Sequence, residues 1–386
     1  MTHLETVEIL ERLVGFPTVS SETNLELIDW VGSYLNDHGI AFWLERDGDA
    51  GKAGLYALAG PRVEGGIILS GHSDVVPVEG QTWLSDPWRL TERGGRYYGR
   101  GTCDMKGFVA AVLSRLTAAD PGMLQKPILL ALSRDEEIGC VGARPLIAHM
   151  KRALPTAAAA IIGEPTMMQV SDCHKGGGTY AVTVQGHEVH SSIMHRGISA
   201  IMVSGRLIEW INGENKRLAA KAGSDMQRRF DPPYPTLHVG RIKGGTAPNI
   251  TAGECRFDLE IRSLPDHGHD AILERFLDFA RRVEGEMQTI SPATGIELAK
   301  RADAPPLRSE NGGRAEELAC ALTGQTRMYA APYITEAGLF QEAGFSSVVC
   351  GPGDVAQAHC ANEYIAAEQL SQCENFVDAL IVRLSQ

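Results

Sequence analysis

Short apolar runs that end beside a histidine or a carboxylate constrain the fold of this chain more than any other sequence feature. Residues 67–70, 128–132 and 158–162 each have the length and composition of a buried β-strand. The residues that follow them are His72 and Asp74, then Asp135, Glu136 and Glu137, and finally Glu164. In open α/β sheets the carboxyl ends of the strands form the edge where ligands bind. We therefore expect an α/β fold in which one mixed sheet, covered by helices, gathers these side chains at one edge.

The segment Tyr98–Gly107 adds a further carboxylate. Asp104 lies between glycines that permit a tight turn, and the residues after it have the apolar spacing of a helix. A fifth segment, Ala358–His359, places a histidine late in the chain. One such residue is as often structural as functional. Five segments, each with a ligand-type residue next to small or turn-forming residues, are hard to explain by packing alone.

Composition limits the partners of this chain. A length of 386 residues exceeds what one hydrophobic core usually supports, which predicts two domains. The net charge of -12 repels phosphate backbones, so we expect no nucleic-acid partner. The longest apolar runs fall short of the ~20 residues that cross a bilayer, so we expect no membrane association. The N-terminal residues do not resemble a signal peptide and the cysteines form no Cys-x-x-Cys pair, which favours a cytoplasmic protein with reduced thiols.

The pattern of predicted elements changes near residue 178. Strand patterns and helix patterns then follow in the order β-α-β-β-α, over residues 179–185, 198–220, 237–242, 252–261 and 266–283. This order is typical of a small open α+β sandwich. Beyond about residue 289 the earlier alternation returns. We predict a catalytic domain in two parts, residues 1–177 and 289–386, with a second domain inserted at residues 178–288.

The residues at the predicted strand ends suit a pair of divalent metal ions, with Asp104 as the carboxylate that bridges them. Two ions ~3.5 to 4 Å apart can activate water and polarise a carbonyl, which is metal-assisted hydrolysis. Neighbouring side chains in residues 135–137 cannot all point the same way. We therefore predict Glu137 as a ligand and Glu136 as the general base. Asp74, two residues after His72, is placed to orient that imidazole.

Four segments resemble the metal motifs of the M20 family of dinuclear zinc hydrolases. These are residues 71–77, 98–107, 135–139 and 163–166, and the likeness extends over nearly the whole chain. The resemblance implies a zinc-aminopeptidase-like catalytic domain and an inserted lid and dimerisation domain. It implies that His72, Asp104 and Glu164 hold one metal ion. By the same resemblance, Asp104, Glu137 and His359 hold the other ion. The ions would be Zn²⁺, with Co²⁺ as an alternative for this ligand set.

The resemblance also implies roles for Glu136 and for three residues of the inserted domain. Glu136 would be the proton shuttle, while His190 would reach across a homodimer to stabilise an oxyanion. Asn249 and Arg262 would bind the substrate carboxylate, for which a bidentate guanidinium is a suitable partner. Two residues depart from the family pattern. Met194 replaces a usual proline of the lid motif, and Cys360 follows His359 where lysine is frequent.

Three further segments resemble the branch of the family that acts on N2-acetyl-L-ornithine. They are residues 230–234, 335–340 and 349–359. This likeness implies a small N-acyl amino acid as the substrate and release of L-ornithine and acetate, a step of arginine biosynthesis. N-succinyl-diaminopimelate, other N-acyl amino acids and dipeptides stay open as substrates.

Two other classes of protein fit this sequence less well than a hydrolase does. A catalytically silent relative would bind a ligand or partner without turnover, but the complete ligand set and Glu136 argue against it. A Rossmann-type nucleotide site would need Gly-x-Gly-x-x-Gly, and the pattern that begins at Gly99 has Asp104 where the third glycine belongs.

Overall fold

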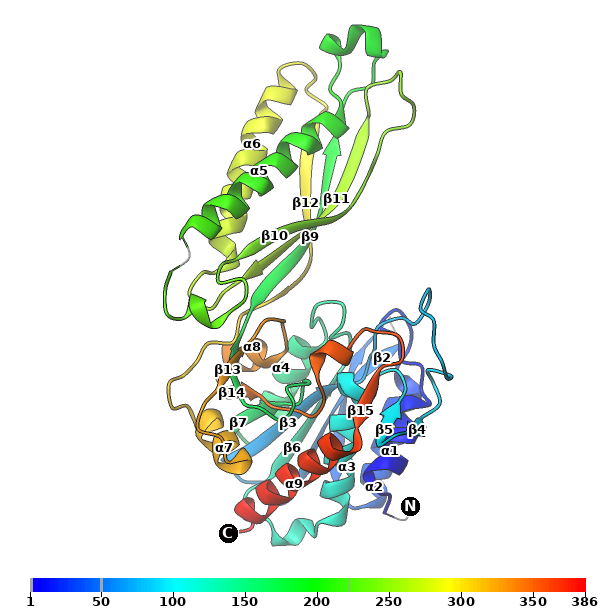
Figure 1. The fold of residues 1–386 in the computed structure, drawn as a ribbon, viewed down its shortest axis with the longest axis vertical. Coiled ribbons are helices and arrows are strands. Elements are labelled where there is room, and N and C mark those ends of the chain that lie inside the picture. The colour runs from blue at the N-terminus through cyan, green and yellow to red at the C-terminus, as the bar shows by residue number, and fades with distance from the viewer. Residues whose placement is uncertain (1–2, 49–50, 222) are drawn as a thin grey trace. The chain divides into compact units, whose positions relative to one another are not determined.

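The computed structural model describes residues 3–48, 51–221 and 223–386. The chain forms two compact units, each drawn in Figure 1. Unit 1 comprises residues 1–173, 307–330 and 335–386, and unit 2 comprises residues 174–306 and 331–334.

The boundaries predicted at residues 178 and 288 do not coincide with these bounds. The larger difference is at the second boundary, because strand β12 (Gly295–Ala304) pairs along its length with β9 (Gly176–Gln185). These backbone hydrogen bonds place residues 295–304 in the sheet of unit 2, whereas the sequence pattern assigned them to the catalytic domain.

An eight-stranded mixed sheet forms the centre of unit 1, with the order β1–β2–β6–β3–β7–β14–β8–β13. The strands are β1 (Ala41–Asp47), β2 (Lys52–Ala59), β3 (Gly66–His72), β6 (Ile128–Ser133), β7 (Ala157–Ile162), β8 (Ser171–His174), β13 (Tyr329–Ala331) and β14 (Ser346–Val349). Strands β6, β3, β7 and β14 are parallel neighbours. They are apolar and almost wholly buried because helices cover both faces of the sheet.

The helices of unit 1 divide between the two faces of the sheet. The main hydrophobic core is enclosed by α1 (Thr6–Val14), α2 (Leu25–Asp37), α3 (Gly107–Ala118), α7 (Arg314–Thr323) and α9 (Ala367–Leu384). The other face is covered by α4 (Ala143–Ala153) and α8 (Ala337–Glu342). In α1 the buried residues Ile9, Leu10 and Leu13 recur with the helical period, so burial of one face determines where this helix packs.

A small three-stranded sheet joins the first and last sequence segments of unit 1. It consists of β4 (Thr91–Arg93), β5 (Arg96–Tyr98) and β15 (Tyr364–Ala366). Antiparallel pairing of β15 with β5 brings the residues that precede Tyr364 beside the residues that follow Tyr98.

Unit 2 contains a four-stranded antiparallel sheet with the order β10–β11–β9–β12. Its other elements are β10 (Thr236–Gly244), β11 (Glu254–Ser263), α5 (Ala200–Lys221) and α6 (His269–Gln288). Alternate residues of the strands pack against both helices, which lie side by side in Figure 1. The predicted α/β domain accompanied by an α+β sandwich is thus confirmed. Among the helices of the described ranges, none is both long and apolar enough to span a membrane.

Candidate metal centre

Three neighbouring parallel strands deliver the first group of site residues. His72 is the last residue of β3, residues 135–137 follow β6, and Glu164 follows β7. Strand β3 lies between β6 and β7, so the carboxyl ends of all three meet at one edge of the sheet. Residues that are far apart in the sequence therefore lie close together in space.

Asp104 lies between the two predicted histidine ligands. Its Oδ1 is 3.0 Å from His72 Nε2, and its Oδ2 is 3.3 Å from His359 Nε2. The cluster continues on both sides, because Glu164 Oε1 is 3.8 Å from His72 Nε2 and Glu137 Oε2 is 2.9 Å from His359 Nε2. All five predicted ligands thus form one continuous group. One carboxylate oxygen of Asp104 faces each histidine, which is the arrangement a bridging carboxylate needs.

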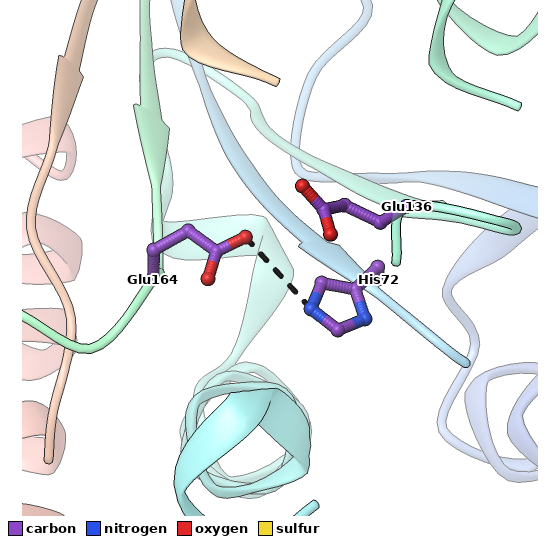
Figure 2. A group of neighbouring side chains, drawn as sticks. All are labelled: His72, Glu136 and Glu164. Atoms are coloured by element: carbon purple, nitrogen blue, oxygen red, sulfur yellow. Dashed lines mark ion pairs between the residues drawn. The ribbon is translucent and has the colours of Figure 1, made fainter. Parts of the chain in front are cut away.

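Glu136 is close to this group as well. Donor atoms of His72, Glu136 and Glu164 lie within 4.8 Å of one another, as do those of His72, Asp104 and Glu137. Figure 2 shows the Glu136 carboxylate beside the imidazole of His72, with Glu164 on another side of the ring. Cys140 Sγ donates a hydrogen bond to Glu136 Oε1 at 3.2 Å. This contact ties the carboxylate to the turn that follows Glu136 in the chain.

Two carboxylate oxygens of the group show that the residues fit a bound cation. Oε1 of Glu137 and Oε1 of Glu164 are buried and have no hydrogen-bond partner among the described residues. An unsatisfied buried acceptor is costly, and a cation is a physical partner for it. Imidazole nitrogen and carboxylate oxygen are donors that suit zinc, cobalt and manganese.

The pKa values of the three glutamates of the group are raised, because their negative charges are buried close to one another. Burial raises the pKa of Glu136 well above its ordinary value, and burial with the charge of Asp104 raises the pKa of Glu164 in the same direction. Burial and the charge of Asp104 raise the pKa of Glu137 to about 7. Carboxylates bind metal ions in their deprotonated form, so metal binding at these groups is expected to depend on pH.

The pKa values of the two histidines are raised as well. Burial opposes the protonation of His72, yet its hydrogen bond with Asp104 and the charge of Glu164 raise its pKa well above the ordinary value. Hydrogen bonds with Asp104 and Glu137 raise the pKa of His359 to about 10. Protonated imidazoles thus supply the positive charge that the carboxylates require.

Asp74 contacts the imidazole of His72 and also holds the loop that follows β6. Its main-chain oxygen is 2.9 Å from His72 Nδ1, whereas its Oδ1 is 3.7 Å from that nitrogen. The carboxylate accepts hydrogen bonds from the backbone N–H groups of Glu136 and Glu137, at 3.1 and 3.3 Å, and from the hydroxyl of Ser20. Asp74 therefore orients the loop of the two glutamates as well as the imidazole.

Several buried polar residues beside the site were not singled out from the sequence. Glu336 accepts hydrogen bonds from Ser133 and Ser70, and Arg100 pairs with Glu363. The sequence feature that could have indicated Glu363 is its position, four residues after the predicted ligand His359. Each of these contacts joins segments far apart in the chain, so no local sequence period indicates them.

The remaining predicted site residues belong to unit 2. His190 and Asn249 are neighbours there, because the Ser191 N–H donates to the Asn249 carbonyl at 2.8 Å. Both are exposed, and Arg262 pairs with Glu260 on the strand β11. Of the two residues that depart from the family pattern, Met194 is exposed in unit 2 and Cys360 is exposed in unit 1.

The hydrogen bonds of His190 define its tautomer. Nδ1 accepts a hydrogen bond from the Ser192 N–H at 3.2 Å, so the proton of the neutral ring lies on Nε2. An exposed Nε2–H group can donate to an anionic oxygen.

His174, at the start of unit 2, is a buried histidine outside the cluster. Burial lowers its pKa to about 4 from the ordinary value of 6.5, although the carbonyl of Lys175 opposes this shift. Below pH 6.5 the unfolded chain binds a proton that the folded chain does not bind until about pH 4. The protein therefore becomes less stable as the pH is lowered from 6.5 to 4.

We expect the contribution of His174 to the free energy of unfolding to decline by roughly 2 kcal/mol between pH 7.5 and pH 5. Urea unfolding of the wild type and of His174→Gln, which keeps a hydrogen-bond donor, measures this difference. Equal pH dependence in the two proteins would contradict the prediction.

Comparison with known proteins assigns the class. The chain belongs to Peptidase family M20/M25/M40, whose sequence pattern matches residues 68–383. It is accordingly a hydrolase that acts on amide bonds. It is 35% identical to an acetylornithine deacetylase from Myxococcus xanthus, over 95% of this chain and 93% of that protein. An acetylornithine deacetylase from Pasteurella multocida is 30% identical over 97% of each chain.

Solved structures share the fold at low sequence identity. A metallo-carboxypeptidase of the M20 family from Sulfolobus solfataricus has a TM-score of 0.76 and 20% identity, with 99% of each chain covered. A dinuclear metal-binding peptidase of the same family from Bacillus subtilis has a TM-score of 0.65 and 15% identity, over 98% of this chain and 97% of that one. The predicted membership of the M20 family is confirmed.

Proposed function

We propose that this protein removes the acetyl group from N2-acetyl-L-ornithine, giving L-ornithine and acetate for arginine biosynthesis. Similarity to acetylornithine deacetylases over nearly the whole chain supports the substrate. The observation that carries the chemistry is the position of Asp104, which has one oxygen toward His72 and the other toward His359, with Glu136 close by.

Two divalent cations fit this site. His72, Asp104 and Glu164 would hold one, and Asp104, Glu137 and His359 would hold the other. When bound, the cations would polarise the amide carbonyl and lower the pKa of the attacking water. Zinc is the proposed native ion, and cobalt suits the same donors.

Glu136 moves the proton in this scheme. Its carboxylate takes a proton from the water molecule as the oxygen attacks the acetyl carbon. It then delivers the proton to the nitrogen as the C–N bond breaks, so acetate and a free amine result. Burial raises the pKa of Glu136. A raised pKa suits a carboxylate that must hold a proton between these two steps.

We propose that the protein is a homodimer in which unit 2 acts as lid and dimerisation domain. His190 would donate its Nε2–H to the developing oxyanion of the other subunit, with Asn249 and Arg262 at the substrate carboxylate. Removal of one oxyanion donor typically lowers kcat by about 10² to 10³-fold, and we expect this loss for His190→Ala. An unchanged kcat would exclude the oxyanion role.

Mixed dimers separate action within one subunit from action across the dimer. When Glu136→Gln and His190→Ala subunits are unfolded together and refolded in equal amounts, half of the dimers contain one of each. Such a dimer has one intact site if His190 acts across the interface, so about a quarter of wild-type activity returns. No recovery, with mixed dimers present by mass analysis, would contradict this arrangement.

The substrate is tested by ornithine release from N2-acetyl-L-ornithine with metal-reconstituted protein. N-succinyl-diaminopimelate and N-acetyl-methionine serve as competing substrates in parallel assays. A higher kcat/KM for N2-acetyl-L-ornithine is the expected result. A preference for either alternative would replace the proposed substrate and direct attention to Met194 and Cys360. Absence of hydrolysis of all three would favour a silent relative.

A further inference from the structure

Two loops that carry predicted metal ligands are joined by a buried polar network. The first loop, residues 99–104, ends at Asp104, and the second, residues 359–363, begins at His359. The pairing of β5 with β15 places the loops side by side although they are far apart in the sequence. The two residues at the centre of the network are Arg100 and Glu363, each 1% exposed.

Glu363 uses both carboxylate oxygens to hold the first loop. Oε1 accepts hydrogen bonds from the backbone N–H groups of Cys103 at 2.8 Å and Asp104 at 3.0 Å. Oε2 accepts from the N–H of Gly101 at 2.9 Å and from Arg100 Nη1 at 2.8 Å. Asp104 is therefore fixed at its own backbone by a residue of the second loop.

Arg100 reaches in the opposite direction, toward the second loop. Its Nη1 donates to the Cys360 carbonyl at 3.3 Å, and its Nη2 donates to Gln81 Oε1 at 2.6 Å. Gln81 in turn donates from Nε2 to the His359 carbonyl at 2.9 Å. The guanidinium also stacks over Trp83, with 5.2 Å from its carbon to the ring centroid.

The backbone of His359 requires such support. Its φ angle is +61°, in the left-handed region that non-glycine residues adopt at a cost. The carbonyl of His359 and that of the next residue are the atoms that Gln81 and Arg100 hold. The imidazole itself is exposed, so packing around the ring does not fix it.

We propose that Glu363 and Arg100 are positioning residues that set the separation of Asp104 and His359 and so determine binding of the second metal ion. This inference rests on the proposed dinuclear site. A carboxylate is required at position 363 because all four groups that it contacts are donors. A glutamine there would turn an N–H group toward one pair of these donors.

The test is metal binding by the full chain, independent of turnover. Metal-stripped wild type, Glu363→Gln and Arg100→Lys are titrated with Co²⁺, with bound metal counted after desalting and the visible absorption of each ion recorded. Loss of a residue that supports a metal ligand typically weakens metal binding by about 10 to 100-fold. We expect this loss for the second ion in Glu363→Gln, and a smaller loss in Arg100→Lys, with the first ion retained.

Glu316 supplies a matched control. It is 2% exposed and likewise accepts four hydrogen bonds, from the N–H groups of Glu310, Gly312 and Gly313 and from the Ser309 hydroxyl. None of these residues is a predicted ligand. Glu316→Gln should bind both ions as the wild type does, even where its melting temperature falls.

The possible outcomes distinguish the proposed dinuclear site from the positioning role of Glu363 and Arg100. A wild type that binds fewer than two ions would refute the dinuclear site itself. Two ions bound with unchanged affinity in Glu363→Gln and Arg100→Lys would refute the positioning role alone. An equal loss of metal in Glu316→Gln would also overturn it, since general destabilisation would then explain the effect. If Glu363→Gln does not fold, Arg100→Lys decides between these results.

Discussion

Glu136→Gln is expected to lower kcat by about 10² to 10⁴-fold while the variant still binds as many metal ions as the wild type. The amide has nearly the same shape as the carboxylate but cannot accept the proton of the attacking water. The five predicted ligands keep their own contacts, which do not pass through Glu136. Steady-state kinetics with N2-acetyl-L-ornithine and a metal count on the same sample measure both quantities.

Glu342→Gln is a suitable control for this variant. Glu342 is an exposed glutamate of α8 that pairs with Arg144 at the surface, so its loss should leave kcat unchanged. Wild-type turnover by Glu136→Gln would disprove the proton-transfer role. Loss of metal together with turnover would instead make Glu136 part of the ligand set, as its distance to His72 and Glu164 permits.

Asp104→Ala is expected to abolish activity and to weaken binding of both metal ions, because this carboxylate faces both histidines. Chelation of metal from the wild type should also abolish activity, and added Zn²⁺ or Co²⁺ should restore it. Metal ions at 100 times their dissociation constant stabilise a folded protein by about 2.7 kcal/mol. We therefore expect the melting temperature of the stripped wild type to rise when metal is added, and that of Asp104→Ala to rise much less.

Asp378→Ala controls for the removal of a carboxylate. Asp378 lies partly exposed on α9 and pairs with Arg115, away from the predicted ligands. It should respond to metal as the wild type does. An Asp104→Ala protein with a wild-type thermal response to metal would contradict the bridging role, and full activity after exhaustive chelation would contradict metal dependence.

The candidate site was more predictable from sequence than the arrangement that supports it. His72, Glu137 and Glu164 follow strands whose apolar patterns are local, and parallel neighbours bring their ends to one edge. Asp104 and His359 join this group through tertiary contacts. Their place beside small or turn-forming residues indicated them in the sequence, and the motif resemblance then assigned each to a metal ion. Their positions relative to His72 then follow from the fold.

The supporting contacts could not be predicted because they use backbone groups. The Asp74 carboxylate binds the N–H groups of residues 136 and 137, and Glu363 binds those of residues 101, 103 and 104. Any residue supplies such an N–H, so composition gives no sign of the pairing. The end of unit 2 was missed for a similar reason. Strand β12 is half exposed and weakly apolar, and pairing with β9 identifies it.

The position of unit 2 in the chain, after the first sequence segment of unit 1, has a consequence for biosynthesis. Residues 165–358 emerge from the ribosome after Glu164 and before His359. At 5–20 residues per second this interval lasts roughly 10 to 40 s. Until residues 346–349 have emerged, the nascent sheet has β7 without its parallel partner β14, an unpaired edge prone to association with other chains. In the proposed dinuclear site, the second metal ion can therefore be held only after His359 has been synthesised.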